Sequence, residues 1–395
     1  MVAIEQRRCG TRQTRRRPPL VLVVGPASPI DFPMKIAPIV QCAALILAGG
    51  FAHAQDAAPA ARAATAKQPA ADLPGMPGAA KPDPFAATTP FEAVAPVVVG
   101  TGYRFTEGPC WIPASASGPG VFFFCDVPTG RVFRWDGEVG ADGKPTAPTL
   151  LRERSGRALG TAVAPSGLLY HCESEGRRVT AFELKDGKPQ EAIELAAKFE
   201  GKRLNCPNDL VVAKDGTVYF TDPTFFTPKP DLELSFSGVY ALRTDGTLTA
   251  LHRDIKLPNG IALSPDEKTL YVNDFGNGQV MFLDLTETPG SPPPKPGQEA
   301  AAPQLQARVL VSLVKLARDH SISGKGRADG IRVLPDGTLL TTGPGAIYAL
   351  SPAGKLLGTL PIEGASNLAV GGADGRTLLI TSGGQVLTAR LKERK

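Results

Sequence analysis

The chain has 395 residues and a formal net charge of +5, a balance that would suit an acidic partner. Its first 54 residues hold seven basic and two acidic side chains and so account for the whole of this charge. The rest of the chain is close to neutral, which argues against binding nucleic acid or an anionic membrane surface.

Residues 34–54 have the pattern of a secretory signal peptide. Lys35 supplies a short positive region, residues 39–47 form an apolar run, and the segment ends in a small-residue cleavage site, Ala-His-Ala. The apolar run is too short to span a bilayer, and a buried core helix is the alternative interpretation. We expect residues 1–33 to be a mis-assigned upstream extension, with Met34 as the true start. The mature protein is then periplasmic or secreted.

Residues 55–95 follow this predicted signal segment, 1–54, and are rich in Ala and Pro. A stretch with so few large apolar side chains cannot bury enough surface to offset the entropy of ordering it. We therefore predict a disordered tether at 55–95 and a folded domain at 96–395, which is long enough for one large core.

The folded part repeats one pattern six times. Each copy holds a short apolar strand, a turn of Asp-Gly character and a second apolar strand, and a third strand follows. The copies lie at residues 106–127, 158–174, 207–223, 258–275, 328–344 and 365–383. Successive copies are about 50 residues apart once a Pro-rich insertion at 288–304, which we place on a loop, is set aside. Only 191–199 and 309–318 look helical or mixed.

A period of this length with about four strands per unit is typical of a β-propeller. We predict an all-β fold, a six-bladed β-propeller with four-stranded blades around a central metal channel. Residues 93–102 are expected to close the ring by completing the last blade beside 384–391. Two β-sandwiches are the alternative, but they would leave the six matching units unexplained.

The first strand of each propeller blade lines the central channel, so residues just before it meet around the axis. The equivalent positions are predicted to be Glu107, Gly160, Asn208, Asn259, Asp329 and Asn367. Four of them carry carboxylate or amide oxygens, which suit a hard divalent cation. The predicted ligands are Glu107, Asn208, Asn259 and Asp329. Ca²⁺ is preferred, with Zn²⁺, Mn²⁺ and Mg²⁺ as alternatives; a competing interpretation is that each residue caps a local turn.

Further polar residues lie near these positions. Asp126, Asp209, Asp222 and Asp274 are predicted to brace strand ends. Asn367 is expected to face the channel, behind the metal or as a substrate contact. Arg327 is expected to meet a polar substrate, with a solvated position on the rim as the alternative. Cys110, Cys125, Cys172 and Cys206 either pair, in one of three ways, or stay buried as small apolar side chains.

Several segments resemble, in order, the motifs of the gluconolactonase/regucalcin (luciferin-regenerating-enzyme-like) family. They are FTEGPCW (105–111), PNDLVVAKDGTVYFTDP (207–223), PNGIALSPDEKTLYV (258–272), ADGIRVLPDG (328–337) and the tail 345–383. Members of this family are six-bladed propellers with one divalent cation in the channel. The resemblance implies that Glu107, Asn259 and Asp329 ligate the metal and that Asn208 ligates it or contacts the substrate. It also implies that Asp329 is the general base.

These features lead to the hypothesis of a lactonase, an enzyme that opens a gluconolactone-like sugar lactone to its aldonic acid. Asn208, Asn367 and Arg327 are its predicted substrate contacts. The sequence holds no Gly-x-Ser-x-Gly motif, which argues against a covalent acyl-enzyme. The alternatives are hydrolysis of another ester or phosphotriester at the same metal site, and a non-catalytic exported propeller that binds a protein or a glycan. The substrate is left open because the loop at 171–179 and the Pro-rich insertion depart from the family pattern. The oligomeric state is also open.

Overall fold

The computed structural model describes residues 84–114, 119–164, 166–290 and 302–393. The predicted signal segment, the predicted tether as far as residue 83 and the middle of the Pro-rich insertion lie outside the described residues. Helices are few in the described ranges: α1 (Leu313–Asp319) and the 3₁₀ turns η1 (Val127–Thr129) and η2 (Lys229–Asp231). None of them is long and apolar enough to cross a membrane.

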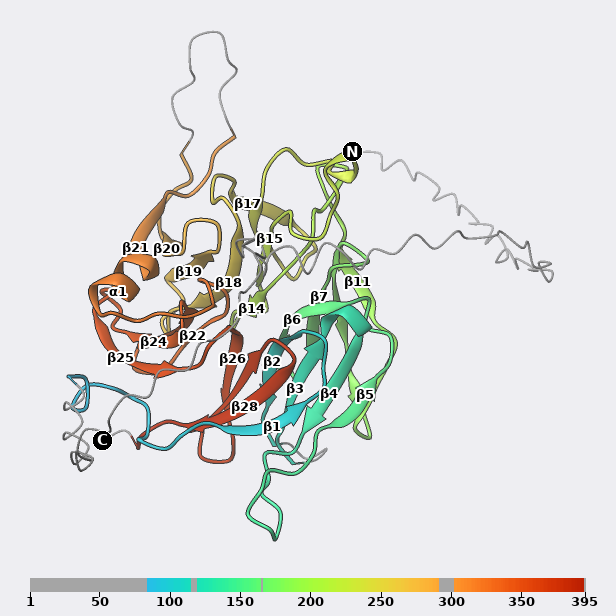
Figure 1. Ribbon diagram of the computed structural model, residues 1–395. Coiled ribbons are helices and arrows are strands. Elements are labelled where there is room, and N and C mark those ends of the chain that lie inside the picture. Colours follow the sequence, from blue (N-terminus) through green and yellow to red (C-terminus); the bar gives the residue numbers. More distant parts are fainter. Residues whose placement is uncertain (1–83, 115–118, 165, 291–301, 394–395) are drawn as a thin grey trace, which may run out of the picture. The chain divides into compact units, whose positions relative to one another are not determined.

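Six four-stranded antiparallel sheets form the blades (Figure 1). Blade 1 contains β2 (Thr106–Ile112), β3 (Val121–Asp126), β4 (Arg131–Trp135) and β5 (Thr149–Arg152). Blade 2 contains β6 (Ala158–Val163), β7 (Leu169–Glu173), β8 (Arg178–Phe182) and β11 (Ile193–Ala196). Blade 3 contains β14 (Leu210–Val212), β15 (Val218–Asp222), β16 (Gly238–Leu242) and β17 (Leu248–His252).

The second half of the chain supplies the other three blades. Blade 4 contains β18 (Pro258–Leu263), β19 (Thr269–Asp274), β20 (Gln279–Asp284) and β21 (Ala307–Ser312). Blade 5 contains β22 (Ile331–Val333), β23 (Leu339–Gly343), β24 (Ala346–Leu350) and β25 (Leu356–Pro361). Blade 6 contains β26 (Ala365–Gly371), β27 (Thr377–Ser382), β28 (Gln385–Arg390) and β1 (Val97–Thr101). Two small hairpins complete the strands: β9 (Leu184–Lys185) with β10 (Lys188–Pro189), and β12 (Lys198–Phe199) with β13 (Lys202–Arg203).

The ring closes as predicted. The N-terminal strand β1 pairs antiparallel with β28, with Val97 opposite Thr388 and Thr101 opposite Gln385. The first strands of neighbouring blades contact one another around the ring, in the order β2, β6, β14, β18, β22, β26 and back to β2. These contacts confirm the six-bladed propeller and rule out two separate sandwiches.

One local prediction was wrong. Residues 191–199 contain β11 and β12 and form no helix. The outer edge of β8 would otherwise present unpaired backbone groups, and pairing with β11 satisfies them. Residues 309–318 do combine a strand, β21, with the start of α1. The Pro-rich insertion connects β20 to β21, and an isolated bridge between Gly290 and Gln304 joins its two ends.

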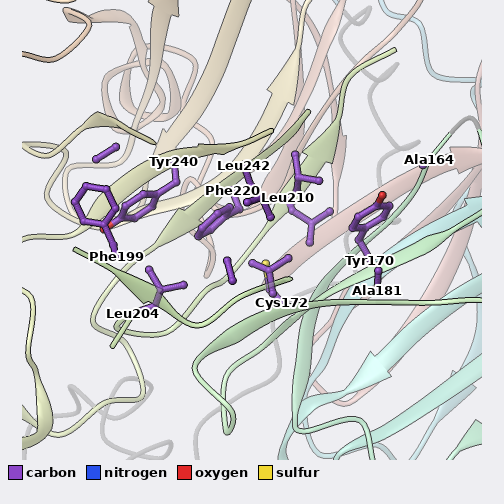
Figure 2. Close-up of a cluster of buried hydrophobic side chains, with 14 of the residues drawn as sticks. Ala164, Tyr170, Cys172, Ala181, Phe199, Leu204, Leu210, Phe220, Tyr240 and Leu242 are labelled. Carbon is purple, nitrogen blue, oxygen red and sulfur yellow. The ribbon is translucent and has the colours of Figure 1, made fainter. Parts of the chain in front are cut away.

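Apolar side chains fill the space between neighbouring blades. Figure 2 shows the cluster between blades 2 and 3, where Phe220 lies between Tyr240 and Leu210. The Phe220 and Tyr240 rings are stacked with centroids 5.1 Å apart, and Phe199 meets Tyr240 edge-on at 5.2 Å. Packing of this kind positions each first strand relative to the next, and so positions the residues that line the channel.

The four cysteines of the described chain are all free and buried. They are Cys110, Cys125, Cys172 and Cys206. Burial raises the pKa of Cys110, Cys125 and Cys206 to about 12. They therefore act as small apolar side chains, which decides between the two interpretations of the sequence.

The described residues ahead of the predicted boundary at residue 95 pack against the blades. Phe91 is only 4% exposed and packs into the core of blades 5 and 6, where it forms a bridge with Leu391. The Thr88 hydroxyl donates to the carbonyl of Leu357 at 2.6 Å, and Glu92 forms an ion pair with Arg376. This segment ties the outer strand of blade 5, β25, to the end of β28 in blade 6, beside the point where the ring closes.

We expect Phe91→Ala to lower the free energy of unfolding by about 3 kcal/mol, because it leaves a cavity in a packed core. Val94→Ala is the matched control, since Val94 lies in the same segment but is 61% exposed. Urea unfolding of the two variants and the parent protein measures the effect. Equal stability of the Phe91 and Val94 variants would show that the segment does not stabilise the ring.

Candidate active site in the central channel

One residue near the start of each first strand forms a ring at one end of the channel. Its members are Glu107, Leu159, Asn208, Asn259, Asp329 and Ser366. The strand pairing aligns them, because the preceding residues Thr106, Ala158, Pro258 and Ala365 each face the last residue of the next strand. Four of the six carry the polar groups that the sequence predicted, from blades 1, 3, 4 and 5.

The predicted alignment was one residue late in two blades. The Gly160 N–H donates to the Asn208 carbonyl at 2.7 Å, just as the Gly260 N–H donates to the Asp329 carbonyl at 2.9 Å. Gly160 therefore corresponds to Gly260, and Leu159 is the ring member of blade 2. In blade 6 the ring member is Ser366 in place of Asn367. The error falls at a β-bulge, since the register shifts between Ala158 and Thr161 in blade 2 and between Ala365 and Asn367 in blade 6.

A second ring lies one residue further along each strand. Its members are Gly108, Gly160, Asp209, Gly260, Gly330 and Asn367. The four glycines are needed because the strands are too close for a side chain. A Cβ at Gly260 would overlap the Asp329 carbonyl oxygen, and one at Gly330 would overlap the Asn367 side chain. Only Asp209 and Asn367 place side chains in this layer.

These two side chains connect to the ring above them. The Asn367 amide donates to Glu107 Oε2 at 3.1 Å and to Asp209 Oδ2 at 3.4 Å. Arg332, from β22, donates to the same Asp209 oxygen at 3.3 Å. A chain of contacts thus runs from the Arg332 guanidinium through Asp209 and Asn367 to Glu107.

Asp209 was wrongly predicted to brace a strand end. It is 1% exposed and lies in the channel, paired with Arg332. The signal that could have found it is positional, because Asp209 stands where the corresponding repeats of blades 1, 4 and 5 have glycine. A carboxylate at a position that admits no side chain in four of the blades is expected to have a partner across the axis.

The other three aspartates do brace strand ends, as predicted. The Asp126 carboxylate accepts the N–H groups of Arg104 and Phe105, both at 3.1 Å. Asp222 accepts those of Asn205 and Cys206, at 2.8 and 2.7 Å. Asp274 accepts the N–H of Leu257 at 3.3 Å in the same way, and also that of Gly276 in the turn after its own strand. Each ties the segment that enters a first strand to the end of the second strand.

Glu107 and Asp329 are the two carboxylates of the upper ring, and the charge of Glu107 acts on Asp329. Burial, together with the nearby Asp209 charge and against the hydrogen bond from the Gly108 N–H, raises the pKa of Glu107 to about 7. Burial raises the pKa of Asp329 well above its usual value, and the charges of Glu107 and Asp209 add to this. Two like charges held close in a buried site favour a bound cation, which would offset both.

The amide side chains complete the donor set. Asn259 is 4% exposed and its side chain forms a hydrogen bond with the Asp329 carboxylate. Asn208 is 8% exposed, and within the described ranges its side-chain amide has no hydrogen-bond partner. Two carboxylates and two amides form an oxygen-rich site of the kind that hard divalent cations prefer. The residues present therefore fit the predicted cation.

The described chain contains no cluster of three or more His, Cys, Asp or Glu side chains arranged to hold a metal. A cation in the channel would therefore need the amide oxygens of Asn208 and Asn259 as well as the carboxylates. Asp329 is the more open of the two carboxylates, since it is partly exposed whereas Glu107 is 6% exposed. An attacking water can reach Asp329 more readily.

Arg327 lies on the exposed loop that leads into Asp329. Its guanidinium stands 5.6 Å from the centre of the Phe275 ring, and the Phe275 ring contacts Phe225 edge-on at 5.1 Å. The side chain is therefore placed by an aromatic neighbour beside the ring. Its role as a substrate contact stays a prediction, as does that of Asn367, which lies in the second ring.

Comparison with known proteins agrees with this geometry. A family model described as "SMP-30/Gluconolactonase/LRE-like region" matches residues 105–384. The gluconolactonase of Zymomonas mobilis is 28% identical over 324 residues, which cover 77% of this chain and 82% of that protein. The solved structure of a gluconolactonase from Xanthomonas campestris is 29% identical with a TM-score of 0.58, and the match covers 75% of this chain and 88% of that one.

A calcium-binding regucalcin from Agrobacterium tumefaciens has a TM-score of 0.54 at 19% identity, covering 76% of this chain and 95% of its own, and shows the fold alone. The family model spans well over half of the chain and includes all four of the predicted ligands. The chain belongs to the SMP-30/gluconolactonase/LRE-like family.

Proposed function

We propose that this protein is a lactonase that uses a divalent cation in the channel to hydrolyse a gluconolactone-like sugar lactone to its aldonic acid. The observation that carries the proposal is the carboxylate pair of the upper ring, buried Glu107 and partly exposed Asp329, with Asn208 and Asn259 beside it. Relatives named gluconolactonases, from Zymomonas mobilis and Xanthomonas campestris, support the reaction class.

When bound, the cation would polarise the lactone carbonyl and stabilise the oxyanion that forms on attack. Asp329 takes the proton from the attacking water, because it is the more accessible of the two carboxylates. The Asn259 side chain holds the Asp329 carboxylate in place. Asn208, whose amide is free of hydrogen bonds to the described chain, can turn towards a ligand or a substrate hydroxyl.

Glu107 is held more rigidly than Asp329. Its Oε2 atom accepts from the Gly108 N–H at 3.0 Å and from the Asn367 amide at 3.1 Å. These two donors orient the carboxylate and leave its other oxygen directed away from them. Glu107 thus acts as a fixed ligand, and proton transfer belongs to Asp329.

Removal of divalent cations should abolish turnover. We expect treatment with EDTA to remove the hydrolysis of glucono-1,5-lactone above the spontaneous rate, and Ca²⁺, Zn²⁺ or Mn²⁺ to restore it. Acid release followed with a pH indicator measures this, and metal analysis of the purified protein gives the stoichiometry. Full activity in EDTA, with no bound metal, would contradict a metal-dependent reaction.

Asp329→Asn should lower kcat by about 100-fold or more, because it removes the base while keeping the shape of the side chain. Asp245→Asn, in the exposed turn between β16 and β17, is the control and should leave kcat unchanged. Circular dichroism of both variants checks that the fold persists. An Asp329 variant that keeps activity within about threefold of the parent would remove this residue from the mechanism.

Without divalent cations, the melting temperature should fall as the pH rises from about 5 to about 7. The pKa of Glu107 is raised from 4.5 to about 7 in the folded protein, so the native state binds this proton more tightly and loses stability as the proton leaves. Asp222 acts in the same direction, and the buried His171, whose pKa burial lowers to about 3, acts in the opposite one.

Calorimetry in EDTA should therefore show a smaller loss of stability over this pH range in Glu107→Gln than in the parent protein, because the variant has no carboxyl to titrate. An identical pH dependence in both proteins would mean that Glu107 titrates normally in the folded state.

A further inference from the structure

A separate polar pocket of about 450 Å³ lies between blades 2 and 3, outside the two rings. Blade 2 contributes Arg157 and the turn at 174–177. Blade 3 contributes Arg203 and the loop at 226–233, which connects β15 to β16. The volume is sufficient for a single sugar ring.

The pocket is at the same end of the propeller as the upper ring. Arg157 comes two residues before Leu159, the ring member of blade 2. The Thr227 hydroxyl, in the pocket wall, donates to the Asn205 carbonyl at 2.5 Å. Asn205 and the ring member Asn208 are three residues apart, so their Cα atoms are separated by at most about 11 Å. A molecule of two linked sugar rings can extend over such a distance.

A buried arginine holds the walls of the pocket together. Arg177 is 7% exposed, and its Nε and Nη1 atoms donate to the carbonyls of Leu204 at 2.6 Å and Asp231 at 2.9 Å. It thereby joins the turn of blade 2 to both sides of the pocket in blade 3. The pocket is therefore formed before any ligand arrives, which lowers the entropic cost of binding.

The lining is polar but balanced in charge. Arg157, Arg177 and Arg203 stand against Glu175, Asp231 and Glu233. Arg157 forms no ion pair and no side-chain hydrogen bond with the described residues. An anion would gain little from such a lining, whereas a neutral ring with several hydroxyls can use planar donors and acceptors together.

An exposed aromatic ring stands at the edge of this pocket. Phe226 lines it and is 53% exposed, an unusual position for a phenylalanine. Its ring contacts Phe225, which in turn contacts Phe275 beneath Arg327. An aromatic wall thus leads from the pocket towards the loop that carries Asp329. The apolar face of a sugar ring can pack on Phe226 while its hydroxyls meet the polar lining.

We propose that the pocket binds the second sugar ring of a disaccharide lactone, in which a glycosyl group is attached to the aldonolactone that is opened in the channel. This inference rests on the proposed lactonase function and specifies its substrate class. The reaction adds one water to the carbonyl carbon and breaks the ring C–O bond. The ring oxygen takes a proton to become a hydroxyl, the product is an aldobionic acid, and the glycosidic bond stays intact.

The test compares glucono-1,5-lactone with the 1,5-lactones of cellobionic, maltobionic and lactobionic acids, all with the cation-loaded full chain. We expect kcat/KM for at least one disaccharide lactone to exceed that for gluconolactone by about tenfold, because binding of the remote ring is available to the transition state. Phe226→Ala and Arg157→Gln should remove most of this gain and leave gluconolactone turnover unchanged. Arg243→Gln, on the exposed turn after β16, is the control and should change neither.

Three results overturn the proposal while leaving the lactonase function standing. The first is a kcat/KM for the disaccharide lactones that is no higher than that for gluconolactone. The second is a preference for disaccharide lactones that persists in both pocket variants. The third is an equal loss of kcat/KM for both substrate types in those variants. If no lactone is hydrolysed, the proposed function fails. Calorimetry with cellobiose, maltose and lactose then tests whether the pocket binds a sugar. Binding that is lost in Phe226→Ala then supports a sugar site, and absence of binding overturns it.

Discussion

The close approach of six strands around the channel determines the arrangement of this site. At the second ring the backbones come so near that four of the six positions must be glycine. N–H groups of this layer donate to carbonyls of the next blade, as from Gly160 to Asn208 and from Gly260 to Asp329. These bonds set the spacing between blades at the height of the site, so the ring residues above them are positioned by backbone contacts.

Only two positions of the second ring, Asp209 and Asn367, carry side chains, and these make the site asymmetric. Asn367 spans from Asp209 to Glu107, and Arg332 neutralises Asp209 from the side of β22. Asp209 is therefore held in place by both partners, and its charge raises the pKa of both Glu107 and Asp329. The carboxylate with fixed hydrogen-bond donors, Glu107, is suited to hold a cation, and the more open one, Asp329, is suited to exchange a proton with water.

The blades do not contribute equally to the mouth of the channel. Blades 1, 3, 4, 5 and 6 supply polar ring members, whereas blade 2 supplies Leu159, which is 3% exposed and packs in the core between blades 1 and 2. Beside that apolar sector the long β15–β16 loop and the turn after β7 form the charge-balanced pocket around Arg177. Polar ring members on one side of the channel mouth and a preformed polar pocket on the other suit a substrate longer than one sugar ring.

The sequence by itself determined the number of blades, the closing strand and four polar members of the upper ring. These follow from local rules, since turn residues and alternating apolar strands recur with a fixed period and the first strand of each blade must face the axis. The tertiary structure alone decided the register of blades 2 and 6, where Leu159 and Ser366 replace the predicted Gly160 and Asn367. A β-bulge shifts pairing by one residue without a marker in the repeat. Only the tertiary structure showed that Asp209 faces Arg332, because these two residues are 123 positions apart in the sequence.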